Sequence, residues 1–259
     1  MSALRRTSLR PLLFGTISFA VLLLAWQLIV DLGLVDGFLV GSPTKVADAL
    51  VDQVSSGVLF EHMKVSAYEL AIGFGIATLL GVVGGVIMGW YDAINDAFDP
   101  FVWLGYASPL VALYPVFLLI FGLGAPTVIA IAVLLAVFPI LINTRSGVRE
   151  VDPKLIQAAR SFGASDGQLF RKVVLPASMP MVMAGLRLGI GRALVGVVVG
   201  EFFVGDRGLG YSVAYYAGLL RTTDMILQVV VIGAIGVLLT QLLSMLERRI
   251  DSWRVEVST

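Results

Sequence analysis

DPKLIQAARSFGASDGQLFRKVVLP, residues 152–176, is a polar and basic stretch between blocks that are otherwise apolar enough to cross a membrane. Asp152 can cap a helix whose first residue is Pro153, where the missing N–H of proline costs nothing. The apolar residues of this helix recur at i, i+3, i+4 and i+7 and form one stripe: Leu155, Ala158, Ala159 and Phe162. Gly163 then stops the helix. The pattern predicts a short amphipathic helix outside the membrane.

A second short helix follows in the same stretch. Ser165 and Gln168 have the spacing of a capping box, and Asp166 suits the positive end of a helix dipole. Its apolar stripe consists of Leu169, Phe170, Val173 and Val174. We expect Pro176 to end it. Two short helices with a tight turn form a compact unit suited to docking on another protein; the alternative is an amphipathic helix that lies on lipid.

Composition places the rest of the chain in a membrane. Hydrophobic residues make up 58% and charged residues 14% of the 259 residues, with a mean hydropathy of +0.94. Ordinary soluble domains have roughly 45–50% apolar residues. The net charge is zero, which gives a nucleic-acid partner no electrostatic support. There is no cysteine, and the single histidine, His62, is expected to be a solvated side chain rather than a metal ligand.

Six segments are long enough to span a bilayer, which needs about 20 apolar residues. They are 11–30, 66–90, 100–121, 127–144, 181–204 and 225–246. The first could instead be a cleaved signal peptide, but its apolar run exceeds the usual length of about 7–15 residues. The expected organisation is an N-terminal tail and first span (1–31), an extracytoplasmic connector with an amphipathic helix after Pro43 (32–65), a core (66–250) whose loop 150–180 is cytoplasmic, and a C-terminal tail (251–259).

Small residues and prolines suggest how the spans are used. Within 66–90 a small residue recurs every four positions, at Gly73, Ala77, Gly81, Gly85 and Gly89, and such a ladder lets a second helix approach closely. Asp92, Asp96 and Asp99 are expected in the next turn. Pro109 and Pro115 interrupt the span 100–121 and free backbone carbonyls. That span is therefore either a lining of a solute pathway or simply a kinked helix.

Basic residues predict the orientation. With six spans and both ends inside, twelve of the 18 Lys and Arg residues fall on the inner side and four on the outer side. The positive-inside rule then places the 152–176 stretch and both termini in the cytoplasm. Interfacial aromatic residues are expected at the inner boundary: Trp90, Tyr91, Trp103 and Trp253.

The span 181–204 carries charges at membrane depth. Arg187 and Arg192 are expected either to reach the interface or a partner, or to serve a function. Glu201 is nine residues beyond Arg192 on the same helix and cannot pair with it. We expect Glu201 near a solute pathway.

The spacing of the 152–176 stretch resembles a known motif. Gln157-Ala158-Ala159, then Gly163 after three residues and Val173-Val174-Leu175-Pro176 after nine more, resemble the EAA motif of permease subunits of bacterial ABC importers. Gln replaces Glu and Val replaces Ile. The order of other motifs resembles the nitrate, sulfonate and taurine branch: Asp99-Pro100, Pro109, Pro115, Phe121-Gly122, Gly147-Val148, Gly185-Leu186-Arg187, Glu201 and Gly208-Leu209-Gly210.

The resemblance implies an all-α integral membrane protein with the type I importer (MetI-like) permease fold, six transmembrane helices and a cytoplasmic coupling helix at about Pro153–Phe162. It implies a homodimer of two permease copies, two cytoplasmic ATPases and an extracytoplasmic solute-binding protein, in a bacterial inner membrane. The expected ATPase-coupling residues are Leu155, Gln157, Ala158, Ala159, Arg160, Phe162 and Gly163. The Gln at 157 removes one charge from that surface and leaves its apolar stripe intact.

The resemblance also indicates which cofactors and solutes to expect. No GxxxxGK[ST] motif occurs, so the chain is expected to bind no cofactor itself, and ATP and Mg²⁺ belong to the partner ATPase. We expect pathway residues at Tyr106, Ser108, Tyr114 and Glu201. The expected solute is a small organic or inorganic anion such as a sulfonate, taurine or nitrate. The alternatives are a pyrimidine precursor or an aromatic acid. A secondary transporter or channel would need no coupling helix, and a membrane enzyme is disfavoured because no His cluster or close carboxylate pair appears in a span.

Overall fold

The described part of the protein is entirely helical. The computed structural model describes residues 9–251, with side chains from 13 to 247, and no strand occurs within that range. The helices are α1 (Leu9–Asp31), α2 (Gly37–Val40), α3 (Pro43–Ser55), α4 (Val58–Trp90), α5 (Asp92–Ala107), α6 (Tyr114–Phe121), α7 (Ala125–Arg149), α8 (Pro153–Ser161), α9 (Asp166–Leu169), α10 (Leu175–Val204), α11 (Leu209–Gly218) and α12 (Thr222–Asp251). The all-α prediction is confirmed.

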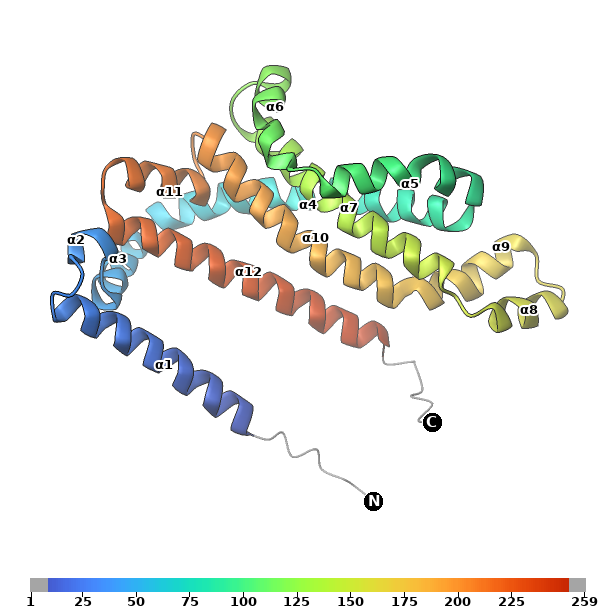
Figure 1. Cartoon of the computed structure of the whole chain (residues 1–259), viewed down its shortest axis with the longest axis horizontal. Coiled ribbons are helices and arrows are strands. Elements are labelled where there is room, and N and C mark those ends of the chain that lie inside the picture. Colours follow the sequence, from blue (N-terminus) through green and yellow to red (C-terminus); the bar gives the residue numbers. More distant parts are fainter. Residues whose placement is uncertain (1–8, 252–259) are drawn as a thin grey trace.

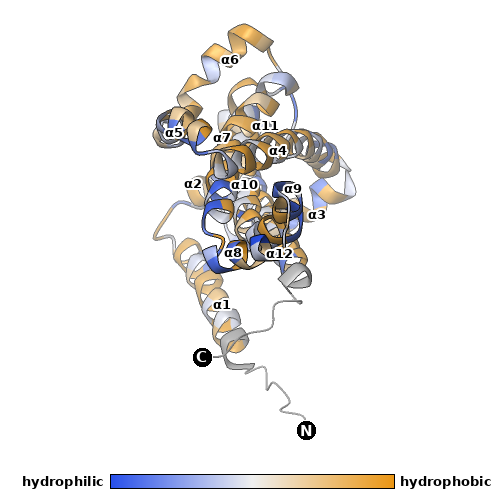
Figure 2. Ribbon diagram, turned by 90° about the vertical axis from the view of Figure 1, so that its right-hand side faces the viewer, coloured by the Kyte–Doolittle hydropathy of each residue, from blue (hydrophilic) through white to orange (hydrophobic). Residues whose placement is uncertain are grey.

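Five of the described helices are long and apolar enough to cross a membrane, namely α1, α4, α7, α10 and α12. A sixth span exists only if α5 and the segment Leu110–Phe121 count together, and these two are bent by 89°. The break falls at Pro109, as the sequence predicts, but the segment begins at Asp92 rather than at Pro100. Ser108 is extended because it precedes Pro109, and this ends α5 before the chain turns into α6. Figures 1 and 2 show α6 projecting from the bundle.

The centre of the bundle is a packing of α4, α7 and α10. A Cβ added at Gly81 of α4 would lie 2.8 Å from Cβ of Ile140, and one at Gly85 would lie 2.6 Å from Cβ of Thr144, both on α7. These helices approach so closely that no side chain fits between them. The predicted small-residue ladder is confirmed as the seam between α4 and α7.

Two helix boundaries differ from those expected. Helix α4 begins at Val58 rather than Ser66, because Leu59 is buried and extends the apolar face. Pro176 does not end the second short helix. The chain passes from α9 through the π-helical turn Phe170–Val174 directly into α10, with Pro176 as the second residue of α10, next to the π-helical turn.

The connector contains the predicted amphipathic helix, α3, capped by Ser42. Gln53 of α3 donates from Nε2 to Oδ1 of Asp224 at 2.9 Å and accepts at Oε1 from Nε2 of Gln228 at 2.7 Å. This polar contact anchors α3 to α12. Figure 1 shows α2, α3 and α11 at one end of the bundle and α8 and α9 at the other, while α1 stands apart.

Some of the residues used to predict orientation lie outside the described range. They are Arg5, Arg6, Trp253 and Arg254. A cytoplasmic position of both termini stays a prediction.

Candidate functional site

The first half of the site is α8, and its ends form as the sequence predicts. Oδ1 of Asp152 accepts a hydrogen bond from the backbone N–H of Lys154 at 2.8 Å. At the other end Gly163 has φ of +76°, a left-handed conformation that glycine adopts without strain. The N–H of the next residue, Ala164, donates to the carbonyl of Ala159 at 3.1 Å and closes the turn. The Asp152 cap and the Gly163 turn thus fix where α8 begins and where it ends.

The second half of the site is α9, which begins with the predicted capping box. The N–H of Ser165 donates to Oε1 of Gln168 at 3.1 Å, and the N–H of Gln168 donates to Oγ of Ser165 at 3.4 Å. Arg160 and Asp166 form an ion pair at 3.5 Å between the two helices. Both side chains are exposed, so this pair adds little stability. The backbone caps, rather than the charges, define the unit, which lies at the end of the bundle that faces the viewer in Figure 2.

The two faces of α8 have different surroundings. Ile156 and Ala159 pack on a small core of this chain, formed by Val148, Val151, Leu169 and Val174. The side chain of Phe162 is 92% exposed and that of Leu155 is 51% exposed, and no described residue covers them. Gln157, Ala158, Arg160 and Gly163 are also exposed.

The predicted apolar stripe is therefore divided. Ala159, which we expected on the docking surface, is turned toward the chain's own core. Leu155, Ala158 and Phe162 remain outward. The inward residue that the sequence analysis missed is Ile156, whose apolar character at i+4 from Asp152 was the available signal. A large apolar side chain left in water at a bundle end is typical of a protein contact.

The unit is firmly joined to the bundle. Leu169 and Val174 are 2% and 1% exposed, and the ring of Phe170 meets that of Trp90 edge-on at 5.2 Å between centroids. Because α9 continues into α10 without a loop, displacement of this unit displaces the start of α10.

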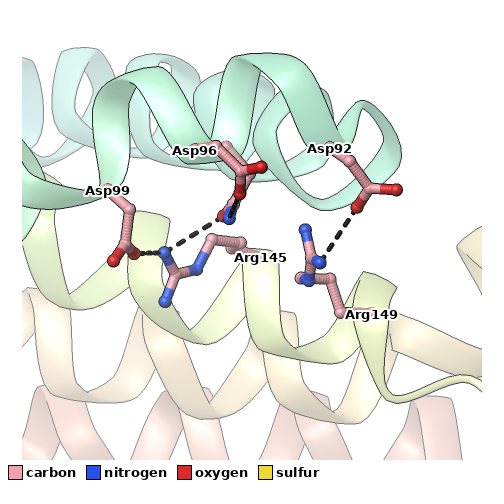
Figure 3. Close-up of polar contacts among 6 residues, drawn as sticks. Asp92, Asp96, Asp99, Arg145 and Arg149 are labelled. Atoms are coloured by element: carbon pink, nitrogen blue, oxygen red, sulfur yellow. Dashed lines mark hydrogen bonds and ion pairs between the residues drawn. The ribbon is translucent and has the colours of Figure 1, made fainter.

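A charged cluster lies on the same end of the bundle, between α5 and α7 (Figure 3). Arg145 of α7 pairs with Asp99 and donates to Oδ1 of Asn95 at 3.2 Å. One turn further, Arg149 pairs with Asp92 at 2.9 Å. Figure 3 shows Asp99 and Asp92 of α5 directed toward Arg145 and Arg149 of α7.

The sequence analysis placed these acidic residues in a turn, which is wrong because they form the first turns of α5. The available signal was their spacing. Asp92, Asp96 and Asp99 follow a helical period, as do Arg145 and Arg149, so each set lies on one face. The α5–α7 cluster holds the amphipathic α5 against the end of α7 that leads into α8.

The predicted pathway residues occupy two places. Tyr106 is 45% exposed near the end of α5, and Oγ of Ser108 donates to the carbonyl of Leu104 at 2.6 Å. Tyr114 begins α6 and stacks on Phe203 of α10 with ring centroids 4.6 Å apart. These three residues border the 89° bend.

Glu201 lies apart from them, with no solvent exposure. Its Oε1 accepts from Oγ of Ser66 on α4 at 2.6 Å, and its Oε2 accepts from the N–H of Gly210 on α11 at 2.6 Å. The N–H of Gly208 donates to Nδ1 of His62 at 3.1 Å, so the expectation that His62 is merely solvated is wrong. In the single chain Glu201 joins α4, α10 and α11.

Comparisons with known proteins bear on this arrangement. The family described as "Binding-protein-dependent transport system inner membrane component" matches residues 78–254. A permease of Bacillus subtilis named for aliphatic sulfonates is 32% identical, covering 93% of this chain and 87% of that protein. The taurine transport permease of Escherichia coli K12 is 30% identical, covering 93% and 89%. The formylaminopyrimidine transport permease of Halalkalibacterium halodurans is 26% identical, covering 95% and 96%.

Among solved structures, the MetNI methionine ABC transporter in an inward-facing form is similar in fold. The alignment has a TM-score of 0.66 and 19% identity, and covers 74% of this chain and 96% of that one. This likeness agrees with the predicted type I permease fold.

Proposed function

From the premise that this chain belongs to the binding-protein-dependent inner membrane components of ABC importers, we propose that it forms, with a second copy, the pathway for a small anion such as a sulfonate, taurine or nitrate. The chain is a multi-pass permease subunit and not an ATPase; ATP is hydrolysed by a separate subunit in this family. The sulfonate and taurine relatives support the anion, since their identities of 32% and 30% exceed the 26% of the formylaminopyrimidine relative.

The proposed complex contains two copies of this chain, two cytoplasmic ATPases that hold ATP and Mg²⁺, and an extracytoplasmic solute-binding protein. This chain itself binds no cofactor and no nucleic acid. The 152–176 stretch and both termini face the cytoplasm of a bacterial cell, as the distribution of basic residues favours.

In this proposal the outer face of α8 docks on the ATPase. The observation that carries it is the 92% exposure of Phe162, at the tip of a unit whose other face is buried in the bundle. Phe162, Leu155 and Ala158 supply apolar contact, while Gln157 and Arg160 supply polar contact around it. Gly163 sets the turn, and Ala159 acts from the inner side by fixing the angle of α8.

Coupling then follows from the connection between α9 and α10. When ATP brings the two ATPases together, α8 and α9 move with them, and the unbroken helix carries the movement into α10. Tyr106, Ser108 and Tyr114, beside the 89° bend, lie where such a movement changes the packing of α6 on α10. At the opposite end of α10, the hydrogen bonds of Glu201 keep α10 in contact with α4 and α11 during this movement.

Uptake into proteoliposomes tests the function. The chain would be reconstituted with its ATPase and binding protein, and labelled taurine, methanesulfonate, nitrate and formylaminopyrimidine would be supplied separately. We expect uptake of one of the anions that requires both ATP and the binding protein. Uptake without ATP would point to a secondary transporter, and uptake of formylaminopyrimidine alone would favour the second candidate function, a pyrimidine-precursor importer, which the 26% identical relative supports.

A further inference from the structure

Arg192 of α10 lies near the middle of the apolar layer. Two residues along α10, Leu194 contacts Gly236 of α12: a Cβ added at Gly236 would lie 3.1 Å from Cδ2 of Leu194. Gly236 is close to the centre of the candidate span Thr222–Glu247. Arg192 is therefore level with the centre of α12.

The packing of α10 against α7 places Arg192 at the same depth by an independent set of contacts. A Cβ added at Gly189 would lie 2.5 Å from Cγ1 of Ile140, and one at Gly196 would lie 2.6 Å from Cα of Ala132. Arg192 falls between these two contacts, opposite the middle of α7, which spans Ala125–Arg149. Each half of a hydrocarbon core is about 15 Å thick, so an arginine at this height is too deep to reach either interface in the way that arginines near helix ends do.

No described residue partners Arg192. It is exposed, as are Leu188 at 56% and Val195 at 50%, one turn away on either side. These three residues define a bare face of α10. Arg187, on the same helix, pairs instead with Glu247 of α12. One arginine of the span is thus neutralised within the chain and the other is not.

A bare, charged face at this depth cannot lie against lipid without a large cost in free energy. Beyond the first turn of α4, the carboxylates of α4, α5 and α10 are paired, hydrogen-bonded within the chain or buried. Asp99 and Asp92 of α5 pair with Arg145 and Arg149, and Asp96 accepts a hydrogen bond from Asn95. Glu69 of α4 and Glu201 are buried, and Glu201 lies about 13 Å along α10 from Arg192. A second copy offers the same residues, so it brings another Arg192 and no accessible carboxylate on the bare face of α10. Two unneutralised arginines require an anion between them.

We infer that the bare face of α10 lines the pathway between two copies and that Arg192 of each copy binds the anionic solute there. This inference rests on the proposed anion transport and deepens it, because it names the residue that recognises the charge. A guanidinium donates paired hydrogen bonds to the oxygens of sulfonate or nitrate. Arg192 would thereby favour anions over neutral solutes of similar size.

Thiol labelling tests the position of Arg192, and the chain contains no cysteine to interfere. Arg192→Cys and, as a control at similar depth, Val237→Cys of α12 would be treated in proteoliposomes of the whole complex with a water-soluble cationic methanethiosulfonate. We expect Arg192→Cys to react at least about tenfold faster than Val237→Cys, because only the former faces water. Equal rates would overturn the inference.

Charge replacement tests the role of Arg192. We expect Arg192→Gln to raise the KM for taurine or methanesulfonate uptake about tenfold or more, and Arg192→Lys to raise it less. Attachment of the cationic reagent to Arg192→Cys restores a positive charge and should recover uptake, whereas a neutral reagent of similar size should not. An unchanged KM in Arg192→Gln would contradict the inference while leaving anion transport intact. Wild-type uptake restricted to a neutral solute would instead refute the proposed function.

Discussion

At the scale of single residues, the proposed coupling site depends on which side of α8 each residue occupies. Helical spacing identified the cap at Asp152, the turn at Gly163 and the capping box at Ser165, because these are local features set by a few adjacent residues. It did not separate Ala159 from Ala158. Which of two neighbouring alanines faces inward depends on where Leu169 and Val174 return in the fold, and no local pattern encodes that.

Replacement of Phe162 tests the outward face of α8. We expect Phe162→Asp to weaken association with the ATPase about tenfold or more, because aromatic anchors dominate such contacts. Its thermal unfolding should match the wild type, since the side chain is 92% exposed in the free chain. Ser161→Ala, on the same helix, serves as the control. Pull-down with the ATPase and calorimetry of the solubilised chain measure the two effects. Full association of Phe162→Asp would exclude this residue from the docking surface.

At the scale of elements, the small-residue ladder of α4 was predictable because its period of four is visible in one stretch of sequence. The 89° bend after α5 was not. Prolines signal a break, but the new direction of the chain is set by packing on α7 and α10. The α5–α7 cluster was missed because its two halves are far apart in the sequence. Arg145 is 46 residues from Asp99 and 50 residues from Asn95.

Two glycines of α4 provide a matched test of the seam between α4 and α7. A Cβ at Gly85 would lie 2.7 Å from the carbonyl oxygen of Leu141, whereas one at Gly75 meets nothing within 4 Å. We expect Gly85→Ala to destabilise the chain by about 1–3 kcal/mol through overpacking, and Gly75→Ala to be neutral or slightly stabilising. Thermal unfolding in detergent distinguishes them. Equal melting temperatures would mean that the helices are not so closely packed.

The α5–α7 cluster contains a more buried pair and an exposed pair. The side chains of Arg145 and Asp99 are 13% and 35% exposed, while those of Arg149 and Asp92 are 40% and 83% exposed. We expect Asp99→Asn to lower stability by more than about 1 kcal/mol and Asp92→Asn by less. High salt should weaken only the contribution of Asp92 appreciably. Melting temperatures of both variants at low and high salt measure this; the reverse order would contradict the burial difference.

At the scale of the whole molecule, the membrane class followed from composition, and the five unbroken spans followed from apolar runs of about 20 residues, which are hard to place anywhere but in a membrane. The exposed surfaces of α1, α6, α8 and α10 have a common explanation in the proposed assembly: lipid, a second permease copy and the ATPase would cover them. The sequence of one chain describes only one of the two surfaces in each such contact. The proposed pathway role of Arg192 therefore could not be inferred from the sequence alone, because only the fold shows that no described residue of its own chain pairs with it.

Cross-linking from α8 tests the central claim, that the outer face of this helix docks on the ATPase. Phe162→Cys and, as a control at the opposite end of the bundle, Lys45→Cys of α3 would each carry a short photoactivatable group in the assembled complex, since the chain has no other cysteine. The account predicts that Phe162→Cys cross-links to the ATPase subunit and that Lys45→Cys does not. A complex that is active in transport but gives no ATPase adduct from Phe162→Cys, or gives one equally from Lys45→Cys, would contradict it.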